Sequence, residues 1–339
     1  MVTLREVAKH SGVSIKTVSR IVNGDPAVNA KTRDSVQVHL QNLNYVPNQA
    51  ARMMRGAQSS VYGLMTDAVA TTPYSVDIVR GAQSALKEQS QTLLIANSNG
   101  DAKQELEFWR MFRAQRVRGV IYASVFHRPH NVGHPAFNDS IVLANCFASA
   151  SDRPSVVPDD EGGGYAQAEY LLKNGHRRIG LLTLIPQIDA TWLRGIGIKR
   201  AFKNAGVAFD EGLNQQGMIG PVHQETMVAY EAALKMLQQK NRPTAIICGH
   251  DQVACHVYAA AAHLGLSVPQ DLSIMGFDDL RVISENLHPR LTTVALPYFE
   301  IGRRAVELMR ESTHQKEGWA PKILVPCPLV ERGSCRTLS

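Results

Sequence analysis

Cysteines, enzyme motifs and long apolar runs are scarce or absent in this chain, and each absence argues against a class of protein. Five of the 339 residues are cysteines, and none are arranged as Cys-x-x-Cys. This pattern argues against a disulfide framework or a zinc site, so we expect reduced cysteines, mostly in the core. No apolar run reaches the roughly 18–20 residues of a membrane helix, so we expect no membrane partner.

The sequence also lacks the common catalytic motifs. It has no Gly-x-x-x-x-Gly-Lys-Ser/Thr, no Gly-x-Ser-x-Gly and no convincing metal triad, so we expect neither an enzyme nor a cofactor or metal. Gly162-Gly163-Gly164 follows two acidic residues without a nearby lysine, which favours a helix start over a phosphate loop. His127, His130 and His134 lie among Arg, Pro and Gly, which favours a solvated loop over a metal cluster.

Positive charge is concentrated at the beginning of the chain. Residues 1–58 hold eight basic and three acidic side chains, and therefore five of the six net positive charges of the protein. A compact basic module joined to a nearly neutral body is typical of polyanion binding. The first residues also lack the basic-then-apolar layout of a signal peptide, which predicts a cytoplasmic protein.

Residues 3–23 have the pattern of two short helices joined by a turn. Thr3 and Glu6 form a capping box, Gly12 ends the first helix, and Ser14 can cap the second. With a third helix over about 29–44, this pattern predicts a helix-turn-helix. In that motif the early residues of the second helix face base edges, while hydroxyls and amides hold phosphates. A solvated helix face is the alternative interpretation. The candidate DNA contacts are Thr3, Ser14, Ile15, Lys16, Thr17, Ser19, Arg20 and Asn23.

These residues carry a family resemblance. The run Thr3-Leu4-x-x-Val7-Ala8-x-x-Ser11-Gly12-Val13-Ser14-x-x-Thr17-Val18-Ser19-Arg20-x-x-Asn23 closely resembles the N-terminus of the lactose/galactose repressor (LacI/GalR) family. Asn44-Tyr45-Val46-Pro47-Asn48-x-x-Ala51-Arg52 resembles the link to that family's hinge helix. The resemblance implies DNA contacts at Asn48 and Arg52, with Met54 as the apolar wedge in the minor groove where the family usually has leucine. The alternative is that Met53 and Met54 pack against the core.

From residue 60 onward, short apolar runs alternate with helical patterns. This alternation predicts parallel sheets with crossover helices, an α/β fold. The predicted strands are 61–65, 93–96, 119–123, 141–144, 179–182, 245–248, 273–277 and 292–295. The predicted helices are 75–88, 102–115, 160–174, 192–205, 224–240, 252–264 and 298–311.

Hydrogen-bonding side chains follow nearly every predicted strand, where ligands of such sheets bind. The set suits a polyhydroxylated ligand, because carboxylates accept hydrogen bonds from hydroxyls and Arg donates two in one plane. Taken singly, a helix cap or turn is the commoner role, and we assign Asp160 and Asp251 as caps. The candidate effector contacts are Asp67, Thr72, Asn145, Arg194, His250 and Asp278, of which the resemblance favours Arg194 and Asp278.

The resemblance continues through the body, for example at Gly175-His176-x-x-Ile179-Gly180 and Gly276-Phe277-Asp278-Asp279. It implies an all-α headpiece with a hinge helix, followed by a two-subdomain core like that of periplasmic sugar-binding proteins, built from doubly wound parallel sheets. The expected boundaries are 1–45 for the headpiece, 46–58 for the hinge and 59–339 for the effector-binding and dimerisation core. Within the core we expect an N-subdomain of about 60–158 and 291–320, and a C-subdomain of about 159–290 and 321–333.

Three segments, among them 70–78 and 141–146, resemble repressors of sucrose-utilisation operons, so a sucrose- or fructose-like sugar is the expected effector. Because one headpiece reads only a half-site, we expect a homodimer on a pseudo-palindromic operator. We also expect a bacterial protein that is associated with the nucleoid when it is bound to DNA. A corepressor-dependent regulator with a non-sugar effector stays open. A transport receptor shares only the body, since it lacks the basic headpiece.

Overall fold

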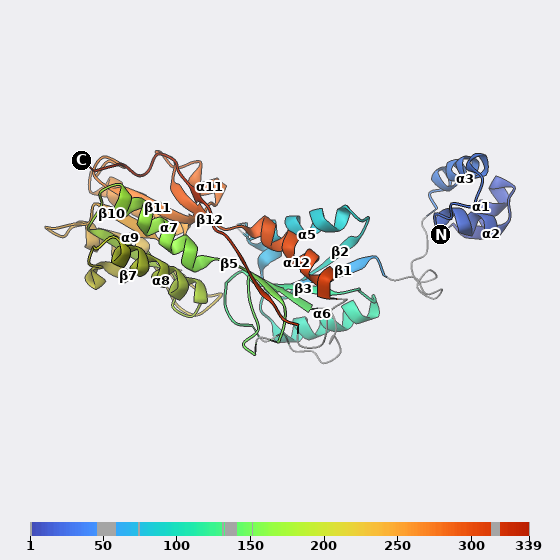
Figure 1. The fold of residues 1–339 in the computed structure, drawn as a ribbon, viewed down its shortest axis with the longest axis horizontal. Helices are drawn as coiled ribbons and strands as arrows, with labels where there is room; N and C mark the ends of the chain where they lie inside the picture. The colour runs from blue at the N-terminus through green and yellow to red at the C-terminus, as the bar shows by residue number, and fades with distance from the viewer. Residues whose placement is uncertain are drawn as a thin grey trace. The chain divides into compact units, whose positions relative to one another are not determined.

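The structure is a computed structural model that describes residues 2–45, 59–73, 75–130, 132, 141–150, 152–312 and 319–338 (Figure 1). The chain forms two compact units, Met1–Ser59 and Ser60–Ser339. We call the first the headpiece and the second the core.

Within residues 2–45, the headpiece contains three short helices around a small apolar centre. The helices are α1 (Leu4–Ser11), α2 (Ile15–Val22) and α3 (Ala30–Asn42). Thr3 and Glu6 form the predicted capping box, and Gly12 ends α1 in the left-handed conformation at φ 69°. Ser14 Oγ accepts a hydrogen bond from Thr17 N and caps α2, as predicted. The helices bury Val7, Ala8, Val18, Ile21, Val28 and Val36.

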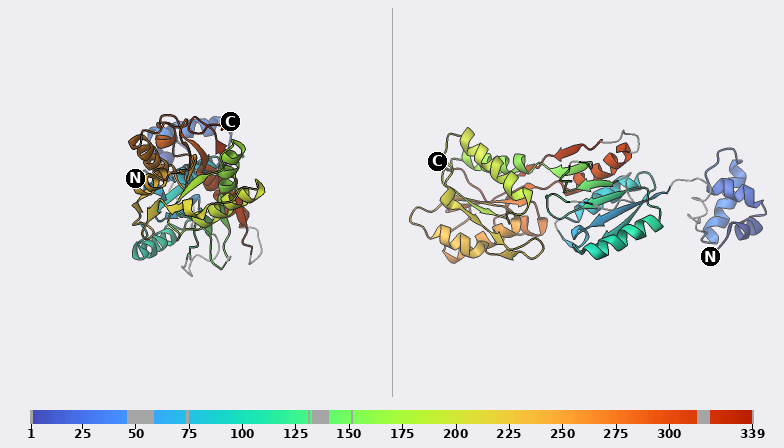
Figure 2. Two further views of the ribbon diagram at one scale, coloured as in Figure 1. Left: turned by 90° about the vertical axis from the view of Figure 1, so that its left-hand side faces the viewer. Right: turned by 90° about the horizontal axis from the view of Figure 1, so that it is seen from below.

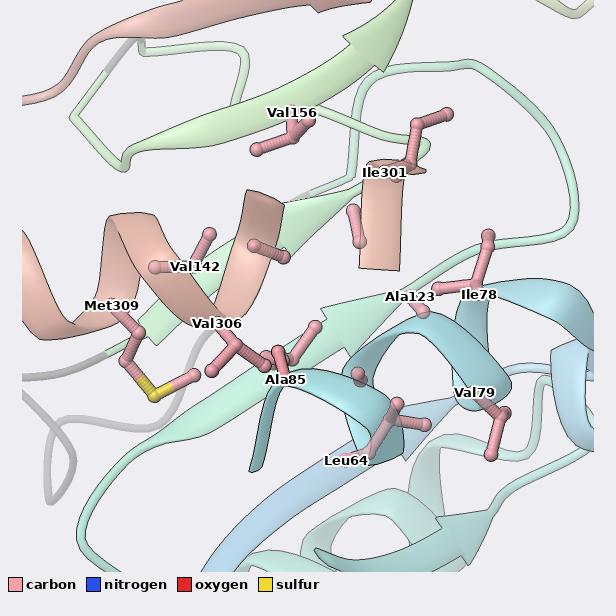
Figure 3. Packing of buried hydrophobic residues seen from close by; sticks show 14 of the residues in the cluster. Leu64, Ile78, Val79, Ala85, Ala123, Val142, Val156, Ile301, Val306 and Met309 are labelled. Carbon is pink, nitrogen blue, oxygen red and sulfur yellow. The ribbon is translucent and has the colours of Figure 1, made fainter. Parts of the chain in front are cut away.

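The first sheet of the core is covered on both faces. Its six parallel strands run in the order β13-β5-β4-β3-β1-β2. Because side chains alternate along a strand, Leu64 packs under two helices on one face while Met65 packs against one helix on the other. Figure 3 shows the packing of the two-helix face. The strands are β1 (Val61–Thr66), β2 (Thr92–Asn97), β3 (Val120–Ala123), β4 (Ile141–Ala144), β5 (Ser155–Pro158) and β13 (Lys322–Val325), and the helices are α5 (Asp77–Lys87) and α12 (Tyr298–Ser312) opposite α6 (Ala102–Ala114).

The second sheet is built in the same way. Its strand order is β14-β12-β11-β10-β6-β7, and only the edge strand β14 pairs antiparallel. Two helices cover each face, in separate apolar clusters. The strands are β6 (Ile179–Thr183), β7 (Asn214–Gln216), β10 (Ala245–Cys248), β11 (Ser273–Asp278), β12 (Thr292–Ala295) and β14 (Leu329–Val330). The helices are α7 (Asp160–Lys173) and α8 (Asp189–Asn204) on one face, and α9 (Ala229–Leu237) and α10 (Asp251–His263) on the other.

The chain crosses between the two sheets three times, and the last two crossings differ from the prediction. β12 pairs with β11 in the second sheet, so the expected first-subdomain segment 291–320 begins too early. β13 pairs with β5 in the first sheet, so 321–333 was wrongly assigned to the second subdomain. We therefore define the first subdomain as 60–158 and 296–326, and the second as 159–295 and 327–338 (Figure 2).

The remaining elements are short. A two-stranded antiparallel ribbon precedes α9, so the predicted helix 224–240 begins only at residue 229. These elements are β8 (Met218–Ile219), β9 (Thr226–Met227), α11 (Arg281–Ser284) and the 3-10 turns η1 (Val69–Thr71) and η2 (Glu211–Leu213). Cys146, Cys248 and Cys327 are buried free thiols, while Cys255 and Cys335 are half-buried. Across the described ranges, no helix is both long and apolar enough to cross a bilayer.

Candidate functional site

The headpiece presents a polar helix surface opposite its apolar centre. Val18 and Ile21 of α2 point inward, while Ile15, Lys16 and Arg20 are exposed. Ile15 is 44% exposed, so an apolar side chain stands among the polar ones on this surface. Such a surface suits contacts with base edges and thymine methyl groups. Thr3, Ser14 and Asn23 are also exposed, and Thr17 and Ser19 are half-buried.

The core contains a cavity of about 320 Å³ at the carboxyl ends of both parallel sheets. The loops after β3, β4, β6 and β10 contribute to it, as do the starts of α7, α8 and α12. This is the place where open α/β sheets bind ligands. The lining residues are Val125, Phe126, His127, Asn145, Pro158, Asp160, Leu184, Ile185, Ile188, Ala190, Arg194, Met218, Glu225, Met227, His250, Gln252, Leu296 and Tyr298.

A chain of contacts between polar side chains crosses between the subdomains at the cavity wall. His127 Nδ1 lies 2.7 Å from Asp160 Oδ2, and Arg194 Nε donates to Asp160 Oδ1 at 2.6 Å. Arg194 also donates through Nη1 to the Gly249 carbonyl at 2.6 Å. Burial alone would raise the pKa of Asp160, but the charge of Arg194 and the hydrogen bond with His127 hold that pKa below its ordinary value. Asp160 is therefore a carboxylate that joins the two subdomains.

Close packing of α7 against α8 brings Arg194 to Asp160. A Cβ atom on Gly164 would lie 2.3 Å from the Arg194 carbonyl oxygen, and one on Gly197 would lie 1.9 Å from the Glu161 carbonyl oxygen. Only glycine permits this approach of the two backbones. Gly162-Gly163-Gly164 lies in the first turns of α7, so the predicted helix start is confirmed.

The turn after β3 is held by two residues that follow neighbouring strands. Asp67 accepts hydrogen bonds from Ser124 Oγ at 2.7 Å and from Val125 N at 3.0 Å. Asn145, at φ 56°, donates through Nδ2 to the carbonyls of Ser124 and Val125, both at 2.9 Å. These bonds fix the start of the loop that carries His127 into the cavity.

His250 also lines the cavity, and both of its ring nitrogens lie close to polar atoms. Its Nδ1 accepts from Gln252 N at 3.1 Å, which caps α10, and its Nε2 lies 2.7 Å from Asp278 Oδ2. Because Nδ1 is an acceptor, the ring carries its proton on Nε2, the nitrogen that lies beside the Asp278 carboxyl group. Asp278 is 4% exposed and is not among the residues that line the cavity, so it lies behind His250.

Two family models match the chain, one over each part. Bacterial regulatory proteins of the lacI family match residues 3–48, and the periplasmic binding protein-like domain matches 168–335. The sucrose operon repressor of Escherichia coli is 33% identical over 340 residues, covering 98% of this chain and all of the relative. The chain belongs to the LacI family of DNA-binding transcriptional repressors.

Other relatives and solved structures agree with this assignment. The repressor PurR of Pectobacterium carotovorum is 30% identical, covering 98% of this chain and 97% of the relative. A LacI-family regulator from Rhizobium etli is 40% identical with a TM-score of 0.78, covering 82% of this chain and 100% of that one. The lac repressor dimer bound to operator and an anti-inducer is 25% identical with a TM-score of 0.79, covering 99% of both chains. The sucrose operon repressor, PurR and the lac repressor are transcriptional repressors and not enzymes, in agreement with the prediction for this chain.

In this LacI-family core, three of the six effector candidates line the cavity, namely Asn145, Arg194 and His250. Asp67 and Asp278 lie behind lining residues. Asp67 holds the loop after β3, and Asp278 lies beside His250 Nε2. Thr72 lies outside the lining and donates to the Ala68 carbonyl. Among the DNA-contact candidates, Asn48, Arg52 and Met54 lie outside the described residues.

Sequence reasoning misjudged several residues of the site. Asp159, not Asp160, caps α7, and His250, not Asp251, caps α10. Asp251 instead accepts hydrogen bonds from Leu280 N and Thr293 Oγ1 between elements.

The predicted solvated loop is also wrong where the structure describes it. His127 is 3% exposed, and His130 is half-buried and stacked on Tyr122. Burial lowers the pKa of His130 to about 4, with the charge of Arg128 acting in the same direction. His134 lies outside the described residues. His127 could have been found, because it follows the predicted strand 119–123 by four residues, at the end of the sheet where ligands bind.

Proposed function

We propose that this LacI-family repressor binds a pseudo-palindromic operator as a homodimer and changes its operator affinity when a sugar enters the core cavity. The observation that carries the proposal is the position of Asp160, which binds His127 of the first subdomain and Arg194 of the second at the wall of one cavity. A ligand there contacts both subdomains and therefore favours one angle between them. Differential contacts of this kind are what an allosteric effector requires.

In the headpiece, we propose that Ile15, Lys16 and Arg20 face base edges in the major groove. Thr3, Ser14, Thr17, Ser19 and Asn23 contact phosphates around them. Residues 46–58 form the hinge, in which Asn48 and Arg52 contact DNA and Met54 is the minor-groove wedge. The protein acts in the bacterial cytoplasm, on the nucleoid.

The effector class rests on the cavity and on the relatives. Hydrogen-bonding groups of Asn145, Arg194 and His250 surround a space large enough for a small ligand. A relative that is 33% identical is a sucrose operon repressor, so a sucrose- or fructose-like sugar is the effector we propose. PurR relatives at 30% identity make a non-sugar corepressor the second candidate.

Two measurements on the full-length protein test the proposal. Selection from a random DNA library should enrich one site with two related half-sites, and the absence of enrichment contradicts specific binding. A panel of neutral sugars is then screened for thermal stabilisation, because a ligand at 100 times its Kd adds about 2.7 kcal/mol to the free energy of unfolding. Operator affinity with and without the stabilising sugar gives the direction of the response. An effect of purine bases instead of sugars supports the second candidate.

A further inference from the structure

Each cationic side chain that lines the cavity is already paired with a carboxylate. Arg194, the only Arg or Lys among the lining residues, donates to Asp160 through Nε. One face of its guanidinium is stacked on the Phe277 ring, with Cζ 3.6 Å from the ring centroid. The two lining histidines face acids too, His127 at Asp160 and His250 at Asp278.

The carboxyl groups at the cavity outnumber its Arg and Lys side chains. Asp160 and Glu225 line the cavity, and Asp278 lies directly behind His250. Arg194 is the one Arg or Lys among the described lining residues, against the carboxyl groups of Asp160, Glu225 and Asp278, and each lining histidine already has a carboxyl group as its neighbour. A phosphate or carboxylate on a ligand needs an unpaired cation or a cluster of free N–H donors to offset the loss of its hydration. The lining residues supply no such cation.

The remainder of the wall is largely aliphatic. It includes Leu184, Ile185 and Ile188 from the loop after β6 and Met218 and Met227 from the β8–β9 ribbon. Contact of this apolar wall with water is unfavourable. The C–H face of a sugar ring, or an apolar group attached to the sugar, would cover the wall and remove its apolar area from water.

Among the described residues that line the cavity, one buried side-chain nitrogen lacks a hydrogen-bond partner. His127 Nε2 has no hydrogen-bond partner, and bulk water has little access to it because the side chain is only 3% exposed. Its Nδ1 is directed to Asp160, so in the neutral ring the proton is on Nδ1 and Nε2 is an acceptor. An unsatisfied buried acceptor destabilises the ligand-free protein, and a ligand hydroxyl that donates to it removes this cost.

We infer that the cavity takes an electrically neutral, hydroxyl-bearing ligand with an apolar face, that one hydroxyl donates to His127 Nε2, and that phosphorylated sugars and sugar acids are rejected. The inference rests on the proposed function, because it specifies the chemistry of the same cavity. It adds a ligand contact at His127 and a charge rule.

Isothermal titration of the full-length protein tests the charge rule. Neutral mono- and disaccharides, including fructose and sucrose, are each compared with their phosphate ester. We expect at least one neutral sugar to bind and its phosphate ester to bind at least tenfold more weakly. A phosphate ester that binds more tightly than its parent sugar overturns the inference but leaves the proposed sugar response intact. Binding of neither set overturns both.

Two substitutions of His127 test the proposed contact. In His127→Asn, the amide nitrogen can replace Nδ1 beside Asp160, but nothing replaces Nε2. In His127→Gln, the amide can instead reach the position of Nε2. We expect neutral-sugar affinity to fall about tenfold in the Asn variant and less in the Gln variant.

The matched control is His130→Asn, which changes a histidine of the same loop outside the cavity lining and should leave sugar affinity within about twofold. Melting temperatures show whether each variant is folded. Unchanged sugar affinity in folded His127→Asn overturns the contact. If His127→Asn does not fold, the Gln variant decides. A folded Gln variant whose sugar affinity is less than one-hundredth of the parent's contradicts the proposal that His127 acts only as a hydrogen-bond acceptor.

Discussion

Arg20 Nε donates a 2.7 Å hydrogen bond to Asp25 Oδ2, in the turn that follows the second helix of the headpiece. The turn is itself held by Arg33, whose Nη2 donates to the carbonyls of Asp25 and Val28 at 3.0 and 3.1 Å. Pairing through Nε leaves both terminal nitrogens of Arg20 available for a guanine edge. Asp25 therefore orients the side chain that we propose to read a base pair.

The first prediction separates base reading from phosphate contact. Arg20→Ala should cost about 1–3 kcal/mol on the selected operator and relax the preference at one base pair in each half-site. Asp25→Ala should relax the same base pair with a smaller loss, because Arg20 remains but is no longer oriented. Operator variants at each position, titrated against both proteins, measure this.

Asp34→Ala is the control, because it removes an equal charge from α3 without a contact to Arg20. It should strengthen binding to all sequences alike. If Arg20→Ala weakens every sequence equally and only reduces the salt dependence, Arg20 is a phosphate contact.

The second prediction concerns the independence of the two units. The headpiece and the core have separate apolar clusters, so a chain starting at residue 59 should fold and bind sugar with unchanged affinity. It should show no specific operator binding, because it lacks α2. Gel-shift and calorimetric titrations of the truncated protein check both statements. Specific operator binding by the truncated chain would place DNA contacts in the core.

The third prediction uses two glycines of the same helix. In α8, a Cβ on Gly197 would lie 1.9 Å from the Glu161 carbonyl oxygen, whereas a Cβ on Gly195 would meet nothing within 4 Å. Gly197→Ala should lower the free energy of unfolding by about 1–3 kcal/mol and weaken sugar binding by separating Arg194 from Asp160. Gly195→Ala should be neutral or stabilise the helix by up to about 1 kcal/mol. Equal melting temperatures for the two variants would contradict the close helix contact.

The fourth prediction is a pH dependence that originates at Asp251. Burial, and next the charge of Asp278, raises the pKa of Asp251 from 3.8 to about 7. The folded protein thus keeps a proton that the unfolded chain releases near pH 4. The stabilisation is complete below pH 4 and is lost as the pH rises through 7.

Asp251→Asn removes this titration while retaining one acceptor oxygen for Leu280 N or Thr293 Oγ1. Between pH 5 and 7 the parent should lose about 2 kcal/mol of stability relative to the variant. Urea unfolding of both proteins at the two pH values gives the difference. Parallel pH profiles would show that Asp251 is ionised throughout this range.

The parts of the fold that depend on local pattern could be predicted from the sequence. The capping box at Thr3, the cap at Ser14 and the strand Ile141–Ala144 all follow from neighbouring residues. β12 was recognised as a strand but assigned to the wrong subdomain, because its sheet is determined by pairing with β11 and not by its own residues.

The errors at the site have a similar cause. His127 follows a strand among polar residues, which suggests solvent exposure, but α7 and α8 of the other subdomain cover it. Asp159 and Asp160 are chemically identical, and the direction in which the backbone enters α7 decides that the first caps the helix and the second meets Arg194. Residue type predicted a polar cavity, whereas contacts between the two subdomains determine which polar groups reach it.

The position of β13 in the first sheet also has a consequence for how the protein is made. This strand, Lys322–Val325, pairs with β5, although more than 160 residues separate the two in the chain. During synthesis from the N-terminus, the headpiece can fold as soon as it leaves the ribosome. Neither sheet of the core can be completed until the last residues of the chain have emerged. A nascent or prematurely terminated chain therefore carries a folded headpiece before it has a complete site for its effector.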